Sequence, residues 1–168
     1  MKKEMEAALN AQINAEFYSS YLYLAMQSYF QSLSLSGFAS WMRCQAQEEL
    51  FHGIKFYNYV NERGGKVILE GIAKPDSIWT SPLQAFEQVL AHERKVTGLI
   101  NDLVEVALNT KDHATNIFLQ WFVTEQVEEE ASAVGIVDKL RLIGNDSSGL
   151  FFLDAELAKR VFTPPQPV

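Results

Sequence analysis

Glu49 and His52 lie three residues apart within the stretch QAQEELFH, so both side chains point to one side of a helix. Apolar residues flank the pair along the same stripe, with Met42 before it and Phe56 after it. A carboxylate and an imidazole therefore interrupt a hydrophobic surface, where a charge is costly to bury unless it is paired or binds a metal. The pair is a candidate for metal binding.

Three further segments with helical periodicity also carry polar residues within their apolar stripes. Each of these residues falls near the middle of its segment, so all of them meet at one level of a helical bundle whichever way each helix runs. The predicted core layer contains Glu16, Glu49, His52, Glu93, Gln126 and Glu129.

Four carboxylates in one buried layer would repel one another by several kcal/mol or more, the order expected for unit charges a few Å apart at low dielectric. Two divalent cations would cancel four negative charges, which favours a dinuclear metal site. Oxygen-rich ligands with a single imidazole suit iron or manganese, and ligand type alone does not separate these two metals. The alternative is a structural layer whose carboxyl groups are protonated or hydrogen-bonded.

A second acidic group lies one residue away from these stripes, at Glu48, Glu125 and Glu128, and could hold a third, more solvated cation. Tyr23 and Trp121 are candidate one-electron donors near the metals, although such aromatic side chains are more often core packing. The remaining polar candidates are interpreted as structural. His92 and His113, without acidic partners at ligand spacing, are expected at the surface, and Cys44 is expected to be a small packed residue.

The elements that position these groups are four long helices, expected over about residues 3–32, 36–63, 82–109 and 112–143. Ser34 or Ser36 is a possible cap for the second helix, and Ser81 and Asp112 are expected caps of the third and fourth. Residues 64–80 form a long crossover in which Val67, Ile68 and Leu69 could pair as a short strand or pack against a neighbour. A short fifth helix is expected over 147–160. The predicted fold class is all-α: one domain, 1–168, forming a four-helix bundle with a long crossover between the second and third helices and a short C-terminal helix.

Composition narrows the class of protein. A chain of 168 residues with a net charge of −7 is long enough for one core and lacks the clustered basic residues that nucleic acid or an anionic membrane surface would need. Its single cysteine allows no intrachain disulfide, and neither a signal peptide nor an apolar run of membrane-spanning length is visible. We expect a cytoplasmic protein without nucleic-acid or membrane partners.

The chain resembles the non-haem ferritins of bacteria and archaea, members of the ferritin-like di-iron superfamily. The resemblance extends over NAEFYSSYLYL (14–24), RCQAQEELFHGIKFYNYVNERGG (43–65), LAHERKV (90–96), FLQWFVTEQVEEEA (118–131) and GLFFLDAEL (149–157). It implies a ferroxidase that oxidises Fe²⁺ to Fe³⁺ with O₂ or H₂O₂ and stores ferric mineral in a hollow shell of 24 identical chains.

The resemblance also assigns residues. It implies that Glu16, Glu49 and His52 hold one iron and that Glu49, Glu93 and Glu129 hold the other, with Gln126 close by and Tyr23 beside the centre. Glu48, Glu125 and Glu128, with Glu129 shared, match a third iron site.

Three positions depart from patterns in related proteins. Leu50 stands where haem-binding relatives have methionine, so no haem is expected. Asn116 and Leu119 occupy the positions of an acidic channel in animal heavy chains, so the resemblance does not establish that route of iron entry here. The alternative function is a non-storing di-iron oxidase or peroxidase of the rubrerythrin type, although the chain lacks the paired Cys-x-x-Cys motifs of a rubredoxin domain.

Overall fold

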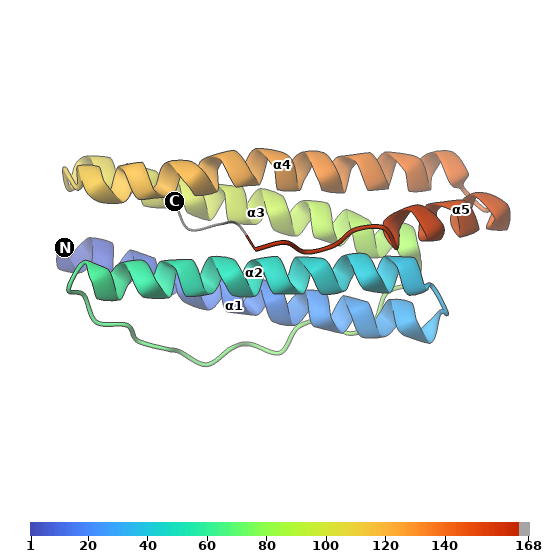
Figure 1. Cartoon of the computed structure of the whole chain (residues 1–168), viewed down its shortest axis with the longest axis horizontal. Helices are drawn as coiled ribbons and strands as arrows, with labels where there is room; N and C mark the ends of the chain where they lie inside the picture. The colour runs from blue at the N-terminus through green and yellow to red at the C-terminus, as the bar shows by residue number, and fades with distance from the viewer. Residues whose placement is uncertain (165–168) are drawn as a thin grey trace.

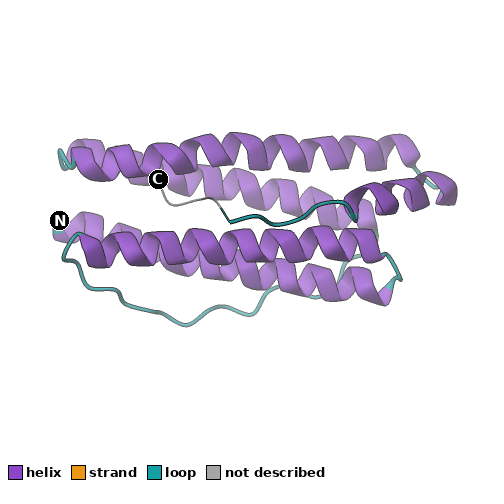
Figure 2. Cartoon of the chain, viewed as in Figure 1, coloured by secondary structure: helices purple, strands orange, loops and turns teal. Residues whose placement is uncertain are grey.

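The computed structural model describes residues 1–164, which form five α-helices and no β-strand (Figures 1 and 2). The helices are α1 (Lys3–Ser32), α2 (Ser36–Glu62), α3 (Pro82–Asn109), α4 (His113–Ile143) and α5 (Ser147–Leu157). The predicted all-α architecture of four long helices and a short fifth one is therefore confirmed. Within the described residues, no helix is both long enough and apolar enough to cross a membrane.

The four long helices form two antiparallel hairpins, α1 with α2 and α3 with α4, and the two hairpins pack side by side (Figure 1). Short turns close each hairpin, whereas the connection from α2 to α3 runs the length of the bundle along the α1 and α2 side. The predicted crossover is present. Val67, Ile68 and Leu69 form no strand, but Val67 packs against an apolar core cluster, which agrees with the packing alternative.

The crossover is fastened to α1 by two asparagine side chains. Asn10 donates its amide N–H to the carbonyl oxygen of Lys66 (3.0 Å) and accepts from the N–H of Ile68 (2.7 Å), so it pairs with the extended chain as a neighbouring strand would. Asn14 donates to the carbonyl oxygens of Glu70 and Gly71. Every one of these contacts is made to the crossover's backbone.

The predicted caps of α3 and α4 are present, since the side chains of Ser81 and Asp112 accept hydrogen bonds from backbone N–H groups in the first turns of these helices. The predicted serine cap of α2 is wrong. Leu35 occupies that N-terminal position without a side-chain cap, and Asp154 of α5 accepts from the N–H groups of Gly37 (2.8 Å) and Phe38 (3.0 Å) instead. A carboxylate from a distant helix thus satisfies donors that a local serine was expected to satisfy.

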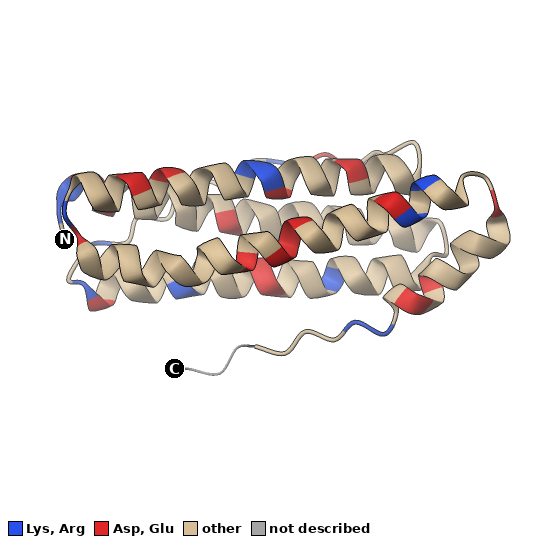
Figure 3. Cartoon of the chain, turned by 90° about the horizontal axis from the view of Figure 1, so that it is seen from above, with Lys and Arg blue, Asp and Glu red and all other residues tan. Residues whose placement is uncertain are grey.

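The fifth helix ends at Leu157, three residues before the predicted boundary. The N–H groups of Lys159 and Arg160 donate to carbonyl oxygens three residues earlier, and this tighter turn ends the α-helix. The following segment runs back along the outside of the bundle, on the side of α2 and α4 (Figures 1 and 3). Smaller differences are that α2 ends at Glu62 rather than 63, and that Asp112 caps α4 rather than beginning it.

The apolar core is divided into two clusters. One, which includes Phe30, Phe38 and Phe86, fills the end of the bundle near α5, and the other includes Phe56 and Phe122 at the opposite end. Leu119 is fully buried in the second cluster, so within a single chain this position is packed core. The predicted polar layer lies between the two clusters.

Candidate metal centre

The four long helices bring all six residues of the predicted layer into the interior. Glu16 comes from α1, Glu49 and His52 from α2, Glu93 from α3, and Gln126 and Glu129 from α4, and every one of them is buried. Acidic residues gather at mid-length of the bundle in Figure 3. The positions at which each helix interrupts its apolar stripe therefore coincide in space.

Glu16, Glu49 and His52 form the most compact group. One ligand atom from each residue lies within 4.8 Å of the others, and Nδ1 of His52 is 3.3 Å from Oε2 of Glu49. Oε2 of Glu16 is buried and has no hydrogen-bond partner among residues 1–164. A buried carboxylate oxygen without a donor is unfavourable unless a cation binds it, so this group fits a divalent metal ion.

The imidazole of His52 is held by aromatic packing. Its ring meets the ring of Trp121 edge-on with centroids 5.4 Å apart and that of Phe122 at 5.7 Å, while Nζ of Lys55 lies 3.7 Å from the Trp121 centroid. These contacts fix the orientation of the His52 ring toward Glu49. Trp121 therefore has a packing role beside the centre.

Glu93 lies on the α3 side of the layer and receives two side-chain hydrogen bonds. The hydroxyl of Tyr23 donates to Oε1 of Glu93, and the amide of Gln126 donates to Oε2 (3.4 Å) and to the Glu93 carbonyl oxygen (3.2 Å). Burial and the charge of Glu129 raise the pKa of Glu93 to about 8, although both hydrogen bonds oppose the rise. Tyr23 thus contacts a candidate metal ligand directly.

The other buried carboxyl groups are perturbed in the same direction. Burial, followed by the charge of Glu49, raises the pKa of Glu16 well above its ordinary value. Burial and the charges of Glu93 and Glu129 raise the pKa of Glu49. Without a cation the layer therefore retains protons at neutral pH, and a bound metal ion would have to displace them.

Two glutamines support the layer and were not singled out in the sequence. Gln12 donates to Oε1 of Glu16 (2.7 Å), and Gln45 donates to Oε2 of Glu129 (2.9 Å). Each glutamine precedes a candidate ligand of its own helix, Glu16 or Glu49, by four residues, which places it on the same helical face. This repeated spacing is a signal from which both supports could have been found.

The second acidic group is not assembled around a common point. Glu48 forms an ion pair with Arg160, Glu125 is half-buried and Glu128 is exposed. Burial raises the pKa of Glu48 to about 7, the charge of Arg160 opposes this rise, and the charges of Glu129 and Glu125 add to it. The three carboxylates lie near the buried layer, but a cation of the protein itself contacts one of them.

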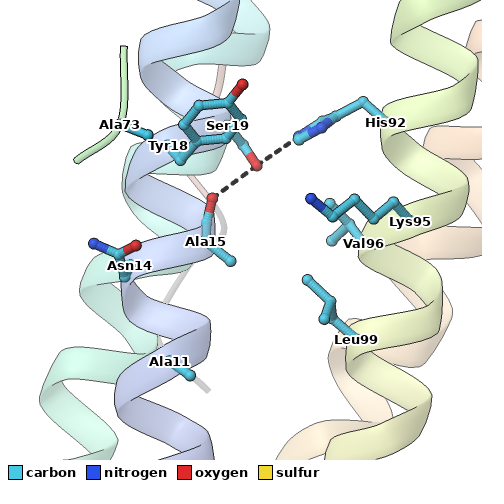
Figure 4. Close-up of a pocket in the computed structure, with 10 residues that line it drawn as sticks. All are labelled: Ala11, Asn14, Ala15, Tyr18, Ser19, Ala73, His92, Lys95, Val96 and Leu99. Atoms are coloured by element: carbon cyan, nitrogen blue, oxygen red, sulfur yellow. Dashed lines mark hydrogen bonds between the residues drawn. The ribbon is translucent and has the colours of Figure 1, made fainter. Parts of the chain in front are cut away.

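His92 is not the surface residue that the sequence predicts. Its Nε2 lies 2.8 Å from the hydroxyl oxygen of Ser19, and its ring packs against Tyr18 and edge-on against Tyr23 (Figure 4). Burial and the charge of Lys95 lower the pKa of His92 to about 4, so the imidazole is neutral. The prediction failed because the partners of His92 come from α1, far away in sequence.

A pocket of about 320 Å³ borders this histidine between α1, α3 and the crossover (Figure 4). Asn14, Ser19 and Lys95 contribute polar groups to its wall, and the crossover contributes Ala73. None of the six residues of the buried layer lines it. The pocket is therefore separate from the candidate metal centre.

Comparison with known proteins agrees with this geometry. Residues 6–143 match the ferritin-like domain family. The chain is 45% identical over 160 residues to a bacterial non-heme ferritin of Bacteroides fragilis, covering 95% of this chain and 99% of that one. It is 44% identical over 162 residues to a bacterial non-heme ferritin of Staphylococcus epidermidis, covering 96% and 98%.

Solved structures give the same result at higher identity. A novel open pore ferritin from the hyperthermophilic archaeon Archaeoglobus fulgidus is 58% identical, with a TM-score of 0.95 over 96% of this chain and 98% of that one. A humanized archaeal ferritin is 60% identical, with a TM-score of 0.97 over 98% and 99%. The chain belongs to the ferritin family, and its relatives place it among the non-haem members.

Proposed function

We propose that this chain is the subunit of an iron-storing ferroxidase. Fe²⁺ is its substrate, O₂ or H₂O₂ is the electron acceptor, and Fe³⁺ is stored as a ferric mineral inside a shell of identical chains. The observation that carries the proposal is the buried group of Glu16, Glu49 and His52 with Glu93 facing it from the other hairpin. Ferritin relatives that match over almost the whole chain support the storage role.

Two Fe²⁺ ions share the layer. Glu16, Glu49 and His52 bind one ion, and Glu49, Glu93 and Glu129 bind the other, so that Glu49 bridges them. Gln126 lies beside the second ion, since its amide already contacts Oε2 of Glu93. This assignment uses the unpartnered Oε2 of Glu16 and gives the buried carboxylates the positive charge that they lack.

The carboxylates favour oxidation for an electrostatic reason. Hard, anionic oxygen ligands stabilise Fe³⁺ more than Fe²⁺, so they lower the free energy needed to remove an electron. The two Fe²⁺ ions together supply two electrons to the acceptor. Protons held by the carboxyl groups of Glu16, Glu49 and Glu93 leave as the ions bind, because their raised pKa values describe the layer without metal.

Tyr23 and the glutamines act as positioning residues. The hydroxyl of Tyr23 holds Glu93, Gln12 holds Glu16, and Gln45 holds Glu129. The bonds to Glu16 and Glu129 leave the second oxygen of each carboxylate for a cation, whereas Oε2 of Glu93 also accepts a hydrogen bond from Gln126. Such supporting bonds fix ligand orientation and raise metal affinity.

Assembly is supported by apolar surface that a single chain leaves uncovered. Phe151 and Phe152 of α5 are about 70% exposed, and Tyr21, Leu24 and Leu50 line an apolar surface groove. Exposed apolar patches of this kind are typical of subunit contacts. We propose that 24 chains form the shell.

The first experiment is aerobic addition of Fe²⁺ to metal-free protein. Ferric absorbance gives the oxidation rate, and iron retained per chain after desalting separates storage from turnover. We expect fast oxidation and retention of far more than the two or three ions that the candidate sites could hold. Retention of about two ions would instead support the non-storing rubrerythrin type, which no observation on the described residues favours.

Two substitutions test the assignment of ligands. His52→Ala and Glu93→Ala should abolish fast oxidation, because each removes a ligand from one of the two ions. His113→Ala and Glu105→Ala are matched controls, since both residues are exposed. Unchanged oxidation by the His52 and Glu93 variants would overturn the proposed centre.

A further inference from the structure

The segment after α5 places a positive charge beside the metal layer. Arg160 lies in the segment that follows α5, and its Nη2 forms an ion pair with Oε2 of Glu48. Both side chains are mostly buried, with 22% and 24% of their surfaces exposed. Glu48 directly precedes Glu49, the proposed bridging ligand.

Arg160 is held through its side chain and its backbone by one stripe of α2. Its Cζ lies 4.5 Å from the ring centroid of Trp41, the thiol of Cys44 donates to the Arg160 carbonyl oxygen (3.5 Å), and Glu48 provides the ion pair. Trp41, Cys44 and Glu48 are spaced three and four residues apart, so they lie on the same face of the helix. The contact is therefore a specific docking of the C-terminal segment on α2.

This docking leaves the guanidinium only partly satisfied. Nη1 of Arg160 is buried and has no hydrogen-bond partner in the part of the chain that the structure describes. A guanidinium carries several donors, and a buried donor without an acceptor weakens the position. Arg160 thus neutralises Glu48 without being tightly locked there.

Glu48 has other neighbours of its own sign. The negative charges of Glu129 and Glu125, both on α4, raise the pKa of Glu48. The charge of Glu128 in turn raises the pKa of Glu125. With a metal ion at this position, these carboxylates would share one cation. With Arg160 docked, one of them is already neutralised.

We propose that Arg160 competes with the third cation for Glu48, and so controls the binding of a metal ion outside the dinuclear centre. A cation that moves from that centre binds Glu48 only when the ion pair between Arg160 and Glu48 breaks. The inference rests on the proposed function, because it needs a cation to be offered at the metal layer. It makes Arg160 a specificity-determining residue for the step after oxidation.

The test is a Zn²⁺ titration of the metal-free, assembled protein, with calorimetry for affinity and metal analysis for the number of ions per chain. Zn²⁺ is redox-silent, so the result does not depend on oxidation. In Arg160→Gln we expect the weakest of the three binding steps to become about five- to tenfold tighter, the order expected for losing a partly buried, charge-assisted competitor. The two tighter steps should not change.

Lys159→Gln is the matched control, because it removes the same charge from an exposed neighbour. Glu48→Gln should lose the weakest step while keeping the other two. Arg160→Lys, which keeps the charge but not the planar guanidinium, should fall between wild type and Arg160→Gln. Unfolding temperatures of all variants identify any that fail to fold.

Two outcomes would overturn the role of Arg160. One is that the weakest Zn²⁺ binding step has the same affinity in the wild type and in Arg160→Gln. The other is that this step becomes equally tighter in Arg160→Gln and in Lys159→Gln, which would reflect net charge alone. Either result with two intact tight steps leaves the ferroxidase centre standing. If the wild type showed none of the three binding steps, the proposed metal centre itself would be wrong.

Discussion

At the scale of single residues, three carboxylates of the candidate centre each have one oxygen that a neighbouring side chain holds by a hydrogen bond. Gln12, Gln45 and Tyr23 each donate to one oxygen of a buried glutamate. This division of labour explains how a layer of acidic side chains is kept in one geometry before any cation binds. It also separates residues that would bind iron from residues that position them.

Gln45→Leu tests this division. The substitution removes the donor to Glu129 and introduces an apolar side chain of similar size, so we expect about tenfold weaker binding of the second cation, at the low end of the range for lost supporting bonds. Titration calorimetry with Zn²⁺ measures the effect. Gln47→Leu on the exposed side of α2 is the control, and equal affinities in the two variants would show that the Gln45 contact is not needed.

The residues whose burial in one layer was predicted from the sequence carry their signal locally. A glutamate or histidine within an apolar helical stripe can be recognised from its own neighbours, as at Glu16, Glu49 and Glu93. His92 was misjudged because Ser19 and Tyr23, its contacts, are on another helix. Arg160 was missed for the same reason, since its partner Glu48 is more than 100 residues away in the chain.

At the scale of elements, the short helix α5 has a structural function, which is to cap the N-terminus of α2. Asp154 supplies the missing N-terminal cap of α2, and Gly37 permits the approach, because a Cβ there would lie 1.7 Å from the Asp154 carbonyl oxygen. No local pattern predicts this contact, since the two residues belong to opposite ends of the chain. The helix boundaries were predicted well wherever a cap or glycine adjoins the helix, and less well at α5.

Asp154→Ala should lower the free energy of unfolding by about 1 kcal/mol, the usual cost of losing a helix cap. Thermal unfolding compared with wild type measures this change. Asp154→Asn keeps an acceptor and should be close to wild type, and Asp102→Ala on the exposed surface of α3 controls for loss of charge. A full-sized effect in Asp154→Asn would contradict the capping role.

The reactivity of Cys44, the only cysteine of the chain, can report whether the segment after α5 stays docked. Cys44 is 6% exposed and its thiol contacts the Arg160 carbonyl oxygen, so loosening the segment should expose it. We expect Arg160→Gln to be modified by a thiol reagent several-fold faster than wild type, because local opening limits the reaction of a buried thiol. Lys159→Gln should react at the wild-type rate, and a matching acceleration there would contradict a specific anchor at Arg160.

At the scale of the whole molecule, a polar layer separates two apolar clusters. The folded chain therefore contains ionisable groups where uninterrupted packing would be more favourable. A loss of folding stability at such positions is typical of functional sites. Metal ions would restore part of this folding stability, because they bind only the folded state.

Stability should depend on pH in a direction set by the raised carboxyl pKa values. Glu93 has a pKa of about 8 in the folded chain and an ordinary value of 4.5, so the folded state binds more protons between these limits. Its contribution is complete below about pH 4.5 and is lost as the pH rises toward 8. Glu16 and Glu49 shift in the same direction.

We therefore expect the unfolding temperature of the metal-free protein to fall as the pH rises from about 5 to 8, with a smaller fall when Zn²⁺ is bound. Scanning calorimetry over this pH range, with and without Zn²⁺, makes the comparison. Glu93→Gln should show a shallower pH dependence, because its amide does not titrate. A metal-free protein that gains stability over the same interval would contradict protonated carboxyl groups in the layer.

The crossover has a consequence for how freely its sequence can change. Asn10 and Asn14 hold it through carbonyl and N–H groups that every non-proline residue possesses, so the side chains at positions 68–71 take no part in those bonds. Val67 and Trp79 of the same crossover differ in this respect, because their side chains pack against the apolar core. The exposed stretch 68–71 is thus a position where foreign peptide sequence could be displayed while the asparagines of α1 continue to hold its backbone.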